Sequence, residues 1–366
     1  MWLDRGRRRI RPAAIADGLA LLLIAVVLNG CRGAETPVLT TQFVAFDSAI
    51  DLSIVGMLEP DARAAAAEVE HDFHFLNRTL HPWESGPMVR VNELLATEQP
   101  FAAPPSLIPL IRQSQILADQ SDDLFNPAIG HLMRIWGFHA DEPECRPPPS
   151  STAIQRLVDA APTMRDLYLD GIMLQSDNSA VQLDFDSIAI GYAMDLAIEN
   201  LRSRGIRSAL INAGGNVRLI GDRDGRPWRI PVRQAGGTSV LGIINASGDA
   251  SVFTAGDFQR NFIYDGRLYH HVIDPRTGQP VRGVHSVTVL HEGSAAVAEA
   301  AATALMVAGL DGWQQIAERM GIGHVLLIDD AGTVHMNPAM AGRLELVDDS
   351  TDVALSAPLV EGQSAR

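Results

Sequence analysis

The chain has 366 residues, of which 46% are hydrophobic and 20% charged, and its formal net charge is -15. This balance is that of a globular protein, long enough for one large domain or two ordinary ones. The acidic charge, with no basic patch in the body of the chain, argues against binding to nucleic acid. Two cysteines, Cys31 and Cys145, are too few for a disulfide framework.

The first 31 residues have the pattern of an export signal. Five arginines between Arg5 and Arg11 precede an apolar run from Leu19 to Leu28, and Gly30 and Cys31 follow. The run is short for a membrane span, although a true anchor helix remains the alternative. A cysteine at this place resembles the lipobox of bacterial lipoproteins. The resemblance implies a protein that is exported and held by a lipid on Cys31 at the periplasmic face of a bacterial membrane.

The rest of the chain predicts a linker over 32–41, one domain over 42–345 and a polar, disordered tail over 346–366. Apolar spacing and turn residues define the elements of that domain. In sequence order, they are a strand Phe43–Val55, helices Asp61–Leu76, Pro104–Asp119 and Thr152–Ala160, a strand Val181–Phe185, a helix Tyr192–Arg204, strands Ala209–Asn212, Arg229–Val232, Gly242–Asn245, Ser251–Thr254 and His285–Leu290, a helix Val297–Ala308 and a strand His324–Ile328. Several strands follow one another directly, which favours an α+β fold over a doubly wound parallel sheet.

Two turns after apolar strands are candidates for ligand contact. Gly214 and Gly215 permit positive φ and a close approach of a ligand to the backbone. The segment Thr254-Ala255-Gly256-Asp257 also ends a strand and suits either a phosphate site or an ordinary turn. Taken alone, neither turn distinguishes a ligand site from a tight reversal of the backbone, and the G-x-G-x-x-G spacing of a dinucleotide site is missing.

The densest polar segment runs from His270 to Gly278 and contains two adjacent histidines, Asp274 and a Pro-x-Thr-Gly turn. Histidine transfers protons near neutral pH. Adjacent residues of a strand point to opposite faces, so only one of the two histidines can face a given site. Asp274 and one of the two histidines are therefore the candidate catalytic residues of this segment.

A second polar pair lies in an almost wholly apolar helix. Glu299 and Thr303 are four residues apart and share one helix face, where their oxygens suit Mg²⁺. A solvated glutamate on an alanine-rich helix is the alternative. The apolar surroundings from Ala295 to Leu310 count against it, because a buried carboxylate without a partner is costly.

Together and in this order, these segments resemble the ApbE family of FAD:protein FMN transferases. The resemblance runs from about Phe43 to Ile328, and its most specific part is His-His-x-Ile-Asp-Pro-x-Thr-Gly at His270–Gly278. The Gly-Gly-Asn turn at Gly214, the Thr-x-Gly-Asp segment at Thr254 and Gly-Tyr-Ala-x-Asp at Gly191–Asp195 also match.

The resemblance implies an ApbE-like fold of mixed or antiparallel sheets flanked by helices, with FAD in a cleft. It implies a Mg²⁺-dependent reaction that joins FMN from FAD to a threonine or serine of an exported acceptor protein and releases AMP. The base would be His271, and the metal ligands would be Glu299, Thr303 and the Ser187 carbonyl. The residues that would contact FAD are Phe46, Trp83, Leu124, Phe125, Asn126, Asp184, Ile190, Gly214, Gly215, Thr254 and Ile273.

Four positions depart from the family pattern, and one of them is Ala255, where the family has Ser. Glu299 stands where the family has a metal-binding Asp, Ile190 where many members have Lys or Glu, and Asn126 where the family has Asp. These departures keep other interpretations open. One is a lipoprotein that binds FAD without catalysis, another is an enzyme that only hydrolyses FAD to FMN and AMP, and a third is a structural lipoprotein without a ligand.

Overall fold

A computed structural model describes residues 36–140, 143–234 and 239–360. The described residues from Val38 to Val360 form one compact unit. The predicted signal over 1–31, including Cys31, lies outside the described residues. The predicted linker over 32–41 is wrong from Val38, where the first strand begins.

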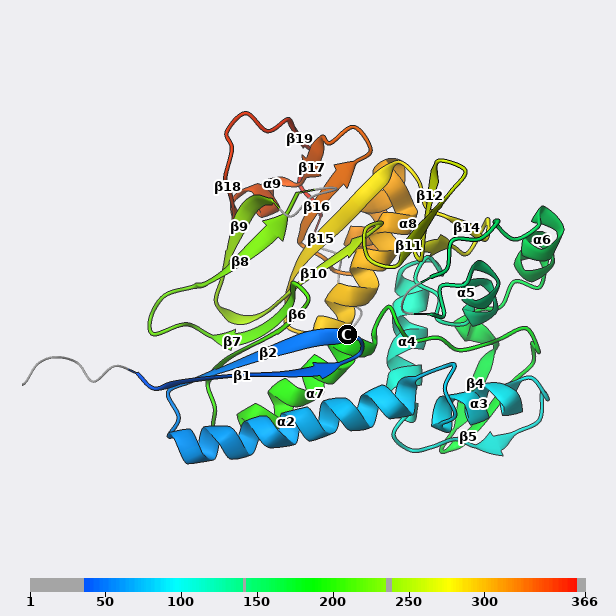
Figure 1. Cartoon of the computed structure of the whole chain (residues 1–366), viewed down its shortest axis with the longest axis horizontal. Coiled ribbons are helices and arrows are strands. Elements are labelled where there is room, and N and C mark those ends of the chain that lie inside the picture. The colour runs from blue at the N-terminus through cyan, green and yellow to red at the C-terminus, as the bar shows by residue number, and fades with distance from the viewer. Residues whose placement is uncertain (1–35, 141–142, 235–238, 361–366) are drawn as a thin grey trace, which may run out of the picture. The chain divides into compact units, whose positions relative to one another are not determined.

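One nine-stranded sheet organises this unit (Figure 1). All its neighbouring strands are antiparallel except the last pair, β17 and β19. In spatial order, its strands are β1 (Val38–Ala45), β2 (Ser48–Val55), β6 (Ser208–Ala213), β7 (Asn216–Gly221), β10 (Gly248–Gly256), β15 (Val284–Glu292), β16 (His324–Asp329), β17 (Val334–Met336) and β19 (Val353–Leu355). This architecture confirms the predicted α+β class.

Helices cover one face of the sheet and a smaller sheet covers the other. Alternate residues of β16 show the division, because Val325 and Leu327 join the core beneath the helices whereas Leu326 and Ile328 join the opposite core. The smaller sheet has the order β18 (Leu344–Leu346), β9 (Val240–Ala246) and β8 (Trp228–Arg233). The helices among the described residues are α2 (Glu59–Leu80), α3 (Pro87–Leu95), α4 (Ile108–Gln120), α5 (Gly130–Trp136), α6 (Ser151–Asp159), α7 (Ala189–Ser203), α8 (Ala295–Arg319) and α9 (Pro338–Ala341). Of these, α9 lies with the smaller sheet, since its Met340 belongs to the opposite core.

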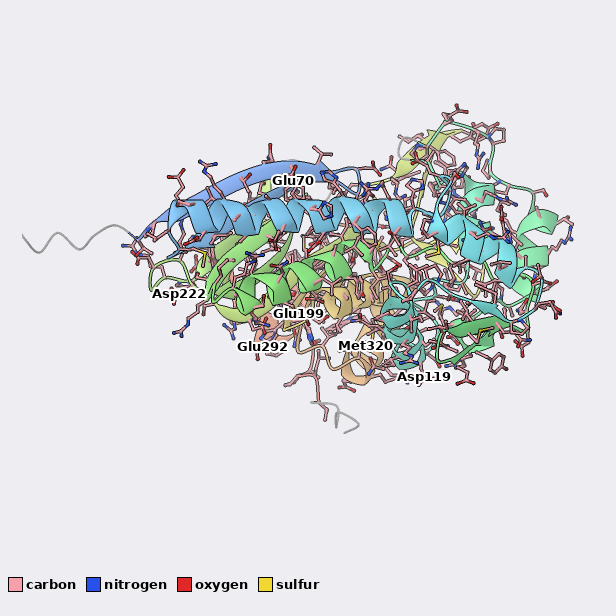
Figure 2. All side chains as sticks on the ribbon, turned by 90° about the horizontal axis from the view of Figure 1, so that it is seen from below. Glu70, Asp119, Glu199, Asp222, Glu292 and Met320 are labelled. Carbon is pink, nitrogen blue, oxygen red and sulfur yellow. The ribbon has the colours of Figure 1, made fainter. Side chains whose placement is uncertain are left out.

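Helices α2 and α7 lie side by side, with Glu70 on the first and Glu199 on the second (Figure 2). Helix α8 packs beside α7 and against β10 and β15. Among the described residues, only α8 is long and apolar enough to span a membrane. Most of its side chains are buried inside the protein, as expected of a core helix.

A third, aromatic cluster supports the His270–Gly278 segment. Strands β11 (Asn261–Tyr264) and β12 (Arg267–His270) form a hairpin, and β13 (Ile273–Asp274) pairs with β14 (Gln279–Pro280). The rings of Phe262 and Tyr269 stack at 5.4 Å, and Trp136 Nε1 donates to the Gly278 carbonyl at 2.8 Å. The segment is thus anchored from both of its ends.

Three predicted elements are wrong. Phe43–Val55 is not one strand but the hairpin of β1 and β2, because Phe46 and Asp47 both take positive φ and reverse the backbone. The stretch Val181–Phe185 is not a strand, since Gln182 makes only an isolated bridge to Ile129. The tail predicted to be disordered contains β19, whose residues pair with β17 at the sheet edge. Sequence reasoning also missed the small sheet of β3 (Phe101–Ala102), β5 (Met173–Ser176) and β4 (Leu167–Asp170).

Candidate active site

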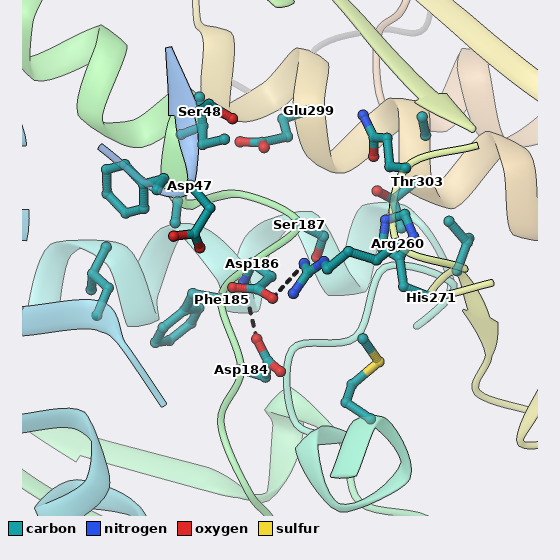
Figure 3. Close-up of a pocket in the computed structure, with 18 of the residues that line it drawn as sticks. Asp47, Ser48, Asp184, Phe185, Asp186, Ser187, Arg260, His271, Glu299 and Thr303 are labelled. Carbon is teal, nitrogen blue, oxygen red and sulfur yellow. Dashed lines mark hydrogen bonds and ion pairs between the residues drawn. The ribbon is translucent and has the colours of Figure 1, made fainter. Parts of the chain in front are cut away.

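A cavity of about 730 Å³ lies where the ends of several elements meet (Figure 3). Its walls come from the turn between β1 and β2, the end of α2, the coil before α7, the turn between β6 and β7, the end of β10, the segment after β12 and the middle of α8. Elements far apart in the sequence therefore share one site, of a size that suits a cofactor-sized ligand.

Two hairpin turns form the side of the cavity nearest the sheet. Phe46 and Asp47 have φ of 49° and 54°, and Gly214 in the neighbouring turn has φ of 59°. A Cβ on Gly214 would lie 3.9 Å from the Ser48 hydroxyl, so the two turns are close together. Gly214 lines the cavity as predicted, whereas the adjacent Gly215 does not, and its N–H donates to Asn212 Oδ1 at 3.0 Å.

The two adjacent histidines point in different directions. His270 Nε2 bonds to the Val281 carbonyl at 2.8 Å and the ring is buried away from the cavity. His271 is half-buried and lines the cavity, while its backbone N–H donates to the Arg260 carbonyl at 3.0 Å. This agrees with the prediction that only one of them faces the site.

The environment of His271 keeps its ring neutral. Burial lowers the pKa of His271 well below the ordinary value, and the charges of Arg260 and His270 lower it further. An imidazole that is uncharged near pH 7 has a free lone pair and can accept a proton from a hydroxyl.

Opposite His271, the cavity contains buried acids (Figure 3). Burial raises the pKa of Glu299 to about 8, and Asp186 and Asp195 add to the shift. The Gly191 N–H donates to Glu299 Oε2 at 2.7 Å. Burial and the charge of Asp186 raise the pKa of Asp184 to about 7. These acids have too few positive partners for all of them to be ionised at neutral pH.

The donor set of this wall fits a hard cation. Glu299, Thr303 and Ser187 all line the cavity and offer only oxygen atoms. The Oδ2 atom of the buried Asp184 has no hydrogen-bond partner among the described residues. Over that same part of the protein, no three acidic, histidine or cysteine residues converge on one point. A cation would therefore be held by Glu299 together with hydroxyl and backbone oxygens, as for Mg²⁺.

Two further predicted residues lie outside the cavity. Both carboxylate oxygens of Asp274 bond to the Arg276 guanidinium at 2.9 Å, and Oδ1 also accepts the Arg276 N–H at 2.9 Å. Asp274 thus shapes the turn after His271, and its carboxylate is not directed into the site. Phe125 is fully buried in the core, because its neighbours Leu124 and Asn126 take the two cavity positions.

The remaining predicted contacts all line the cavity, namely Phe46, Trp83, Leu124, Asn126, Asp184, Ile190, Thr254 and Ile273. The Asn126 amide is already engaged, since it donates to the Pro162 carbonyl at 2.9 Å and accepts from the Ala128 N–H at 3.0 Å. Asn126 stands where the family has Asp, and its amide stabilises the conformation of this loop. The Trp83 ring meets His139 edge-on at 5.4 Å.

Sequence reasoning missed Asp186 and Arg260. They form an ion pair at 2.6 Å inside the cavity (Figure 3). Arg260 is the only lysine or arginine among the cavity-lining residues that the structure describes. The signal for Asp186 was its place two residues after Asp184. No local pattern marked Arg260, because the hairpin of β11 and β12 brings it beside His271.

Comparison with known proteins agrees with this geometry. The model of the ApbE family matches residues 46–326. The chain is 39% identical over 347 residues to a Rhodobacter capsulatus protein named FAD:protein FMN transferase, with 94% of this protein and 65% of that relative covered. It is 31% identical over 274 residues to a Vibrio cholerae protein of the same name, with 73% of this protein and 80% of the relative covered.

Solved structures show the same fold. The ApbE protein of Thermotoga maritima has a TM-score of 0.76 at 27% identity, over 84% of this protein and 99% of that one. The apo flavinyl transferase ApbE of Pseudomonas stutzeri has a TM-score of 0.74 at 28% identity, over 85% and 98%. The family model matches most of the chain, and the fold that surrounds the cavity is that of the solved ApbE structures. The chain therefore belongs to the ApbE family.

Proposed function

We propose that this protein is a FAD:protein FMN transferase, which moves FMN from FAD to a threonine or serine hydroxyl of an exported acceptor protein. The observation that supports this most directly is the arrangement of one cavity. A neutral histidine, His271, lies beside Arg260 in a cavity that also contains the oxygen donors Glu299 and Thr303. The names of the two curated relatives support the same activity.

The proposed reaction needs three contributions from these residues. The acceptor hydroxyl attacks the phosphorus of the FMN half of FAD, and its proton passes to the free nitrogen of His271. The bond between that phosphorus and the bridging oxygen breaks, and AMP leaves with the oxygen. Arg260 supplies positive charge near the pyrophosphate of FAD. A Mg²⁺ ion bound by Glu299, Thr303 and Ser187 would neutralise further phosphate charge.

We propose in addition that the protein is exported and held at the periplasmic face of a membrane by a lipid on Cys31. Support comes from the arginine-rich start, the short apolar run and the cysteine that follows. Expression of the full-length protein and of Cys31→Ala, followed by separation of membrane and soluble fractions, tests this. Equal distribution of the two proteins would contradict a lipid on Cys31.

The transferase is tested by incubating the purified protein with FAD, Mg²⁺ and a flavinylation-domain acceptor. We expect covalent, fluorescent flavin on the acceptor and one AMP per flavin transferred. FMN and AMP formed equally without acceptor would instead identify a FAD hydrolase. FAD binding without any AMP, with several acceptors, would identify a binding protein and refute the transferase.

A further inference from the structure

The Gly191–Asp195 segment of α7 has no role in the chemistry described above, yet it contacts the helix that carries Glu299 and Thr303. We propose that Asp195 is a positioning residue, which fixes the first turn of α8 and thereby sets where the oxygens of Glu299 and Thr303 lie. This inference rests on the proposed use of those two residues as cation ligands.

Asp195 binds the start of α8 through both carboxylate oxygens. Oδ2 accepts from the Ser294 hydroxyl at 2.6 Å and from the Ala296 N–H at 3.0 Å, and Oδ1 accepts from the Ala295 N–H at 2.8 Å. The first N–H groups of a helix have no partner within it, and a carboxylate also suits the positive end of the helix dipole. Asp195 therefore caps α8 from a neighbouring helix.

The N-cap residue itself depends on this contact. Ser294 Oγ accepts from the Val297 N–H at 3.3 Å while its hydroxyl donates to Asp195. Loss of the Asp195 carboxylate would thus leave two N–H groups of the first turn without their acceptor and would release the hydroxyl that caps a third.

Gly191 fixes the distance between the two helices. A Cβ at this position would lie 2.5 Å from the carbonyl carbon and oxygen of the Ala295 backbone, so only glycine permits this approach. The Gly191 N–H donates directly to Glu299 Oε2 at 2.7 Å. Gly191 and Asp195 are four residues apart on one face of α7, and Ala295 and Glu299 are four apart on the facing side of α8. Two contacts one helical turn apart fix both the rotation of α8 and its position along its own axis.

A buried arginine holds Asp195 in this orientation. Arg218 is 3% exposed, and its Nε donates to Asp195 Oδ1 at 2.9 Å. Arg218 also pairs with Asp249, an exposed residue whose carboxylate pairs with Arg202 as well. The Arg218 guanidinium therefore holds the Asp195 carboxylate beside the start of α8.

The test compares Asp195→Asn with Asp249→Asn in the purified full-length protein. Each removes one acidic partner of Arg218, but only Asp195 touches α8. We expect Asp195→Asn to weaken Mg²⁺ binding by about tenfold or more in calorimetry without acceptor, as for other residues that orient metal ligands. FAD affinity without metal should stay within about twofold, and excess Mg²⁺ should restore the transfer rate. Asp249→Asn should bind Mg²⁺ like the parent protein.

Two results would overturn the proposal. One is a folded Asp195→Asn variant with unchanged Mg²⁺ affinity, and the other is an equal loss of affinity in Asp249→Asn, which would indicate general destabilisation. If Asp195→Asn does not fold, Ser294→Ala decides instead, with a severalfold loss of Mg²⁺ affinity expected and no loss contradicting the proposal. A parent protein that binds Mg²⁺ but transfers no flavin would refute the proposed function and leave this inference standing.

Discussion

At the residue scale, adjacent positions in this site differ mainly in what surrounds them. His270 and His271 are the same residue type, but one binds a backbone carbonyl in the interior and the other lines the cavity beside Arg260. Alternation along an extended backbone predicted that only one histidine would face the site, and the family resemblance pointed to His271, which lines the cavity. It misplaced Asp274, because a carboxylate near a catalytic histidine can equally well stabilise the turn that follows.

The role of His271 as a base predicts a separation of binding and chemistry. His271→Ala should lower flavin transfer by at least about a hundredfold, since the acceptor proton loses its base. FAD affinity, measured by quenching of flavin fluorescence, should be almost unchanged. His270→Gln is the control and should keep transfer, because that ring lies outside the cavity. A parallel loss of FAD affinity in His271→Ala would show that the residue binds FAD and is not its base.

The raised pKa of Glu299 predicts opposite effects on stability and metal binding. The folded, metal-free protein keeps this proton up to about pH 8, whereas the ordinary pKa in the unfolded state is 4.5. The folded state thus binds more protons between these values, and its stability falls as pH rises across this window. Glu299→Gln stays neutral, so with a chelator at pH 9 it should unfold at a higher temperature than the parent protein.

Well below pH 4.5, where the glutamate is protonated in both states, the two proteins should unfold at similar temperatures. Calorimetry at neutral pH should show that Glu299→Gln has lost Mg²⁺ binding, because a neutral amide replaces the ionisable ligand. A stability difference that is the same at both pH values would contradict the assigned burial of this carboxylate.

At the scale of elements, α8 shows what sequence patterns reveal and what they miss. The predicted helix Val297–Ala308 ends where the structure has its break, since Gly309 has φ of 71° and ψ of -173° inside Ala295–Arg319. The continuation beyond the break was not predicted. Periodicity also missed the reversal at Phe46 and Asp47, because neither residue is a glycine or asparagine. Strand β2, which follows this turn, pairs with the distant strand β6. Local sequence patterns do not reveal such long-range contacts.

The break in α8 predicts different outcomes for two glycines of the same helix. No atom lies within 4 Å of a Cβ added to Gly309, yet its backbone conformation is one that only glycine adopts readily. Gly309→Ala should therefore destabilise the protein by about 1–3 kcal/mol. Gly312→Ala should be neutral or stabilising, because a helical alanine is favoured by about 1 kcal/mol and its Cβ has a 3.4 Å contact.

Unfolding in denaturant measures both variants. The Arg276 guanidinium, which donates to the Val307 carbonyl at 3.3 Å just before the break, links this region to the His271 segment. Gly309→Ala should therefore also lower the transfer rate. Equal stabilities of the two variants would show that the break is not required by the fold.

At the scale of the whole molecule, the fold class was predictable but the site was only partly so. Successive strands indicated an α+β fold, and the motifs placed His271, Glu299 and most FAD positions on one cavity. The partnership of Asp186 with Arg260 and the capping of α8 by Asp195 depend on contacts between residues far apart in the sequence. Composition and spacing describe one segment at a time and do not contain such pairs.

Because the cavity joins elements from Phe46 to Thr303, a ligand there should stabilise the whole unit. A ligand present at a hundred times its Kd adds about 2.7 kcal/mol to the free energy of unfolding. For a domain of this size, that raises the unfolding temperature by several degrees. FAD with Mg²⁺ should give this shift in calorimetry as a single transition, and riboflavin, which lacks phosphate, should give less. An equal shift with riboflavin would mean that neither Arg260 nor a cation at Glu299 contributes to binding. The absence of any shift with FAD would contradict the assignment of the cavity as the FAD site.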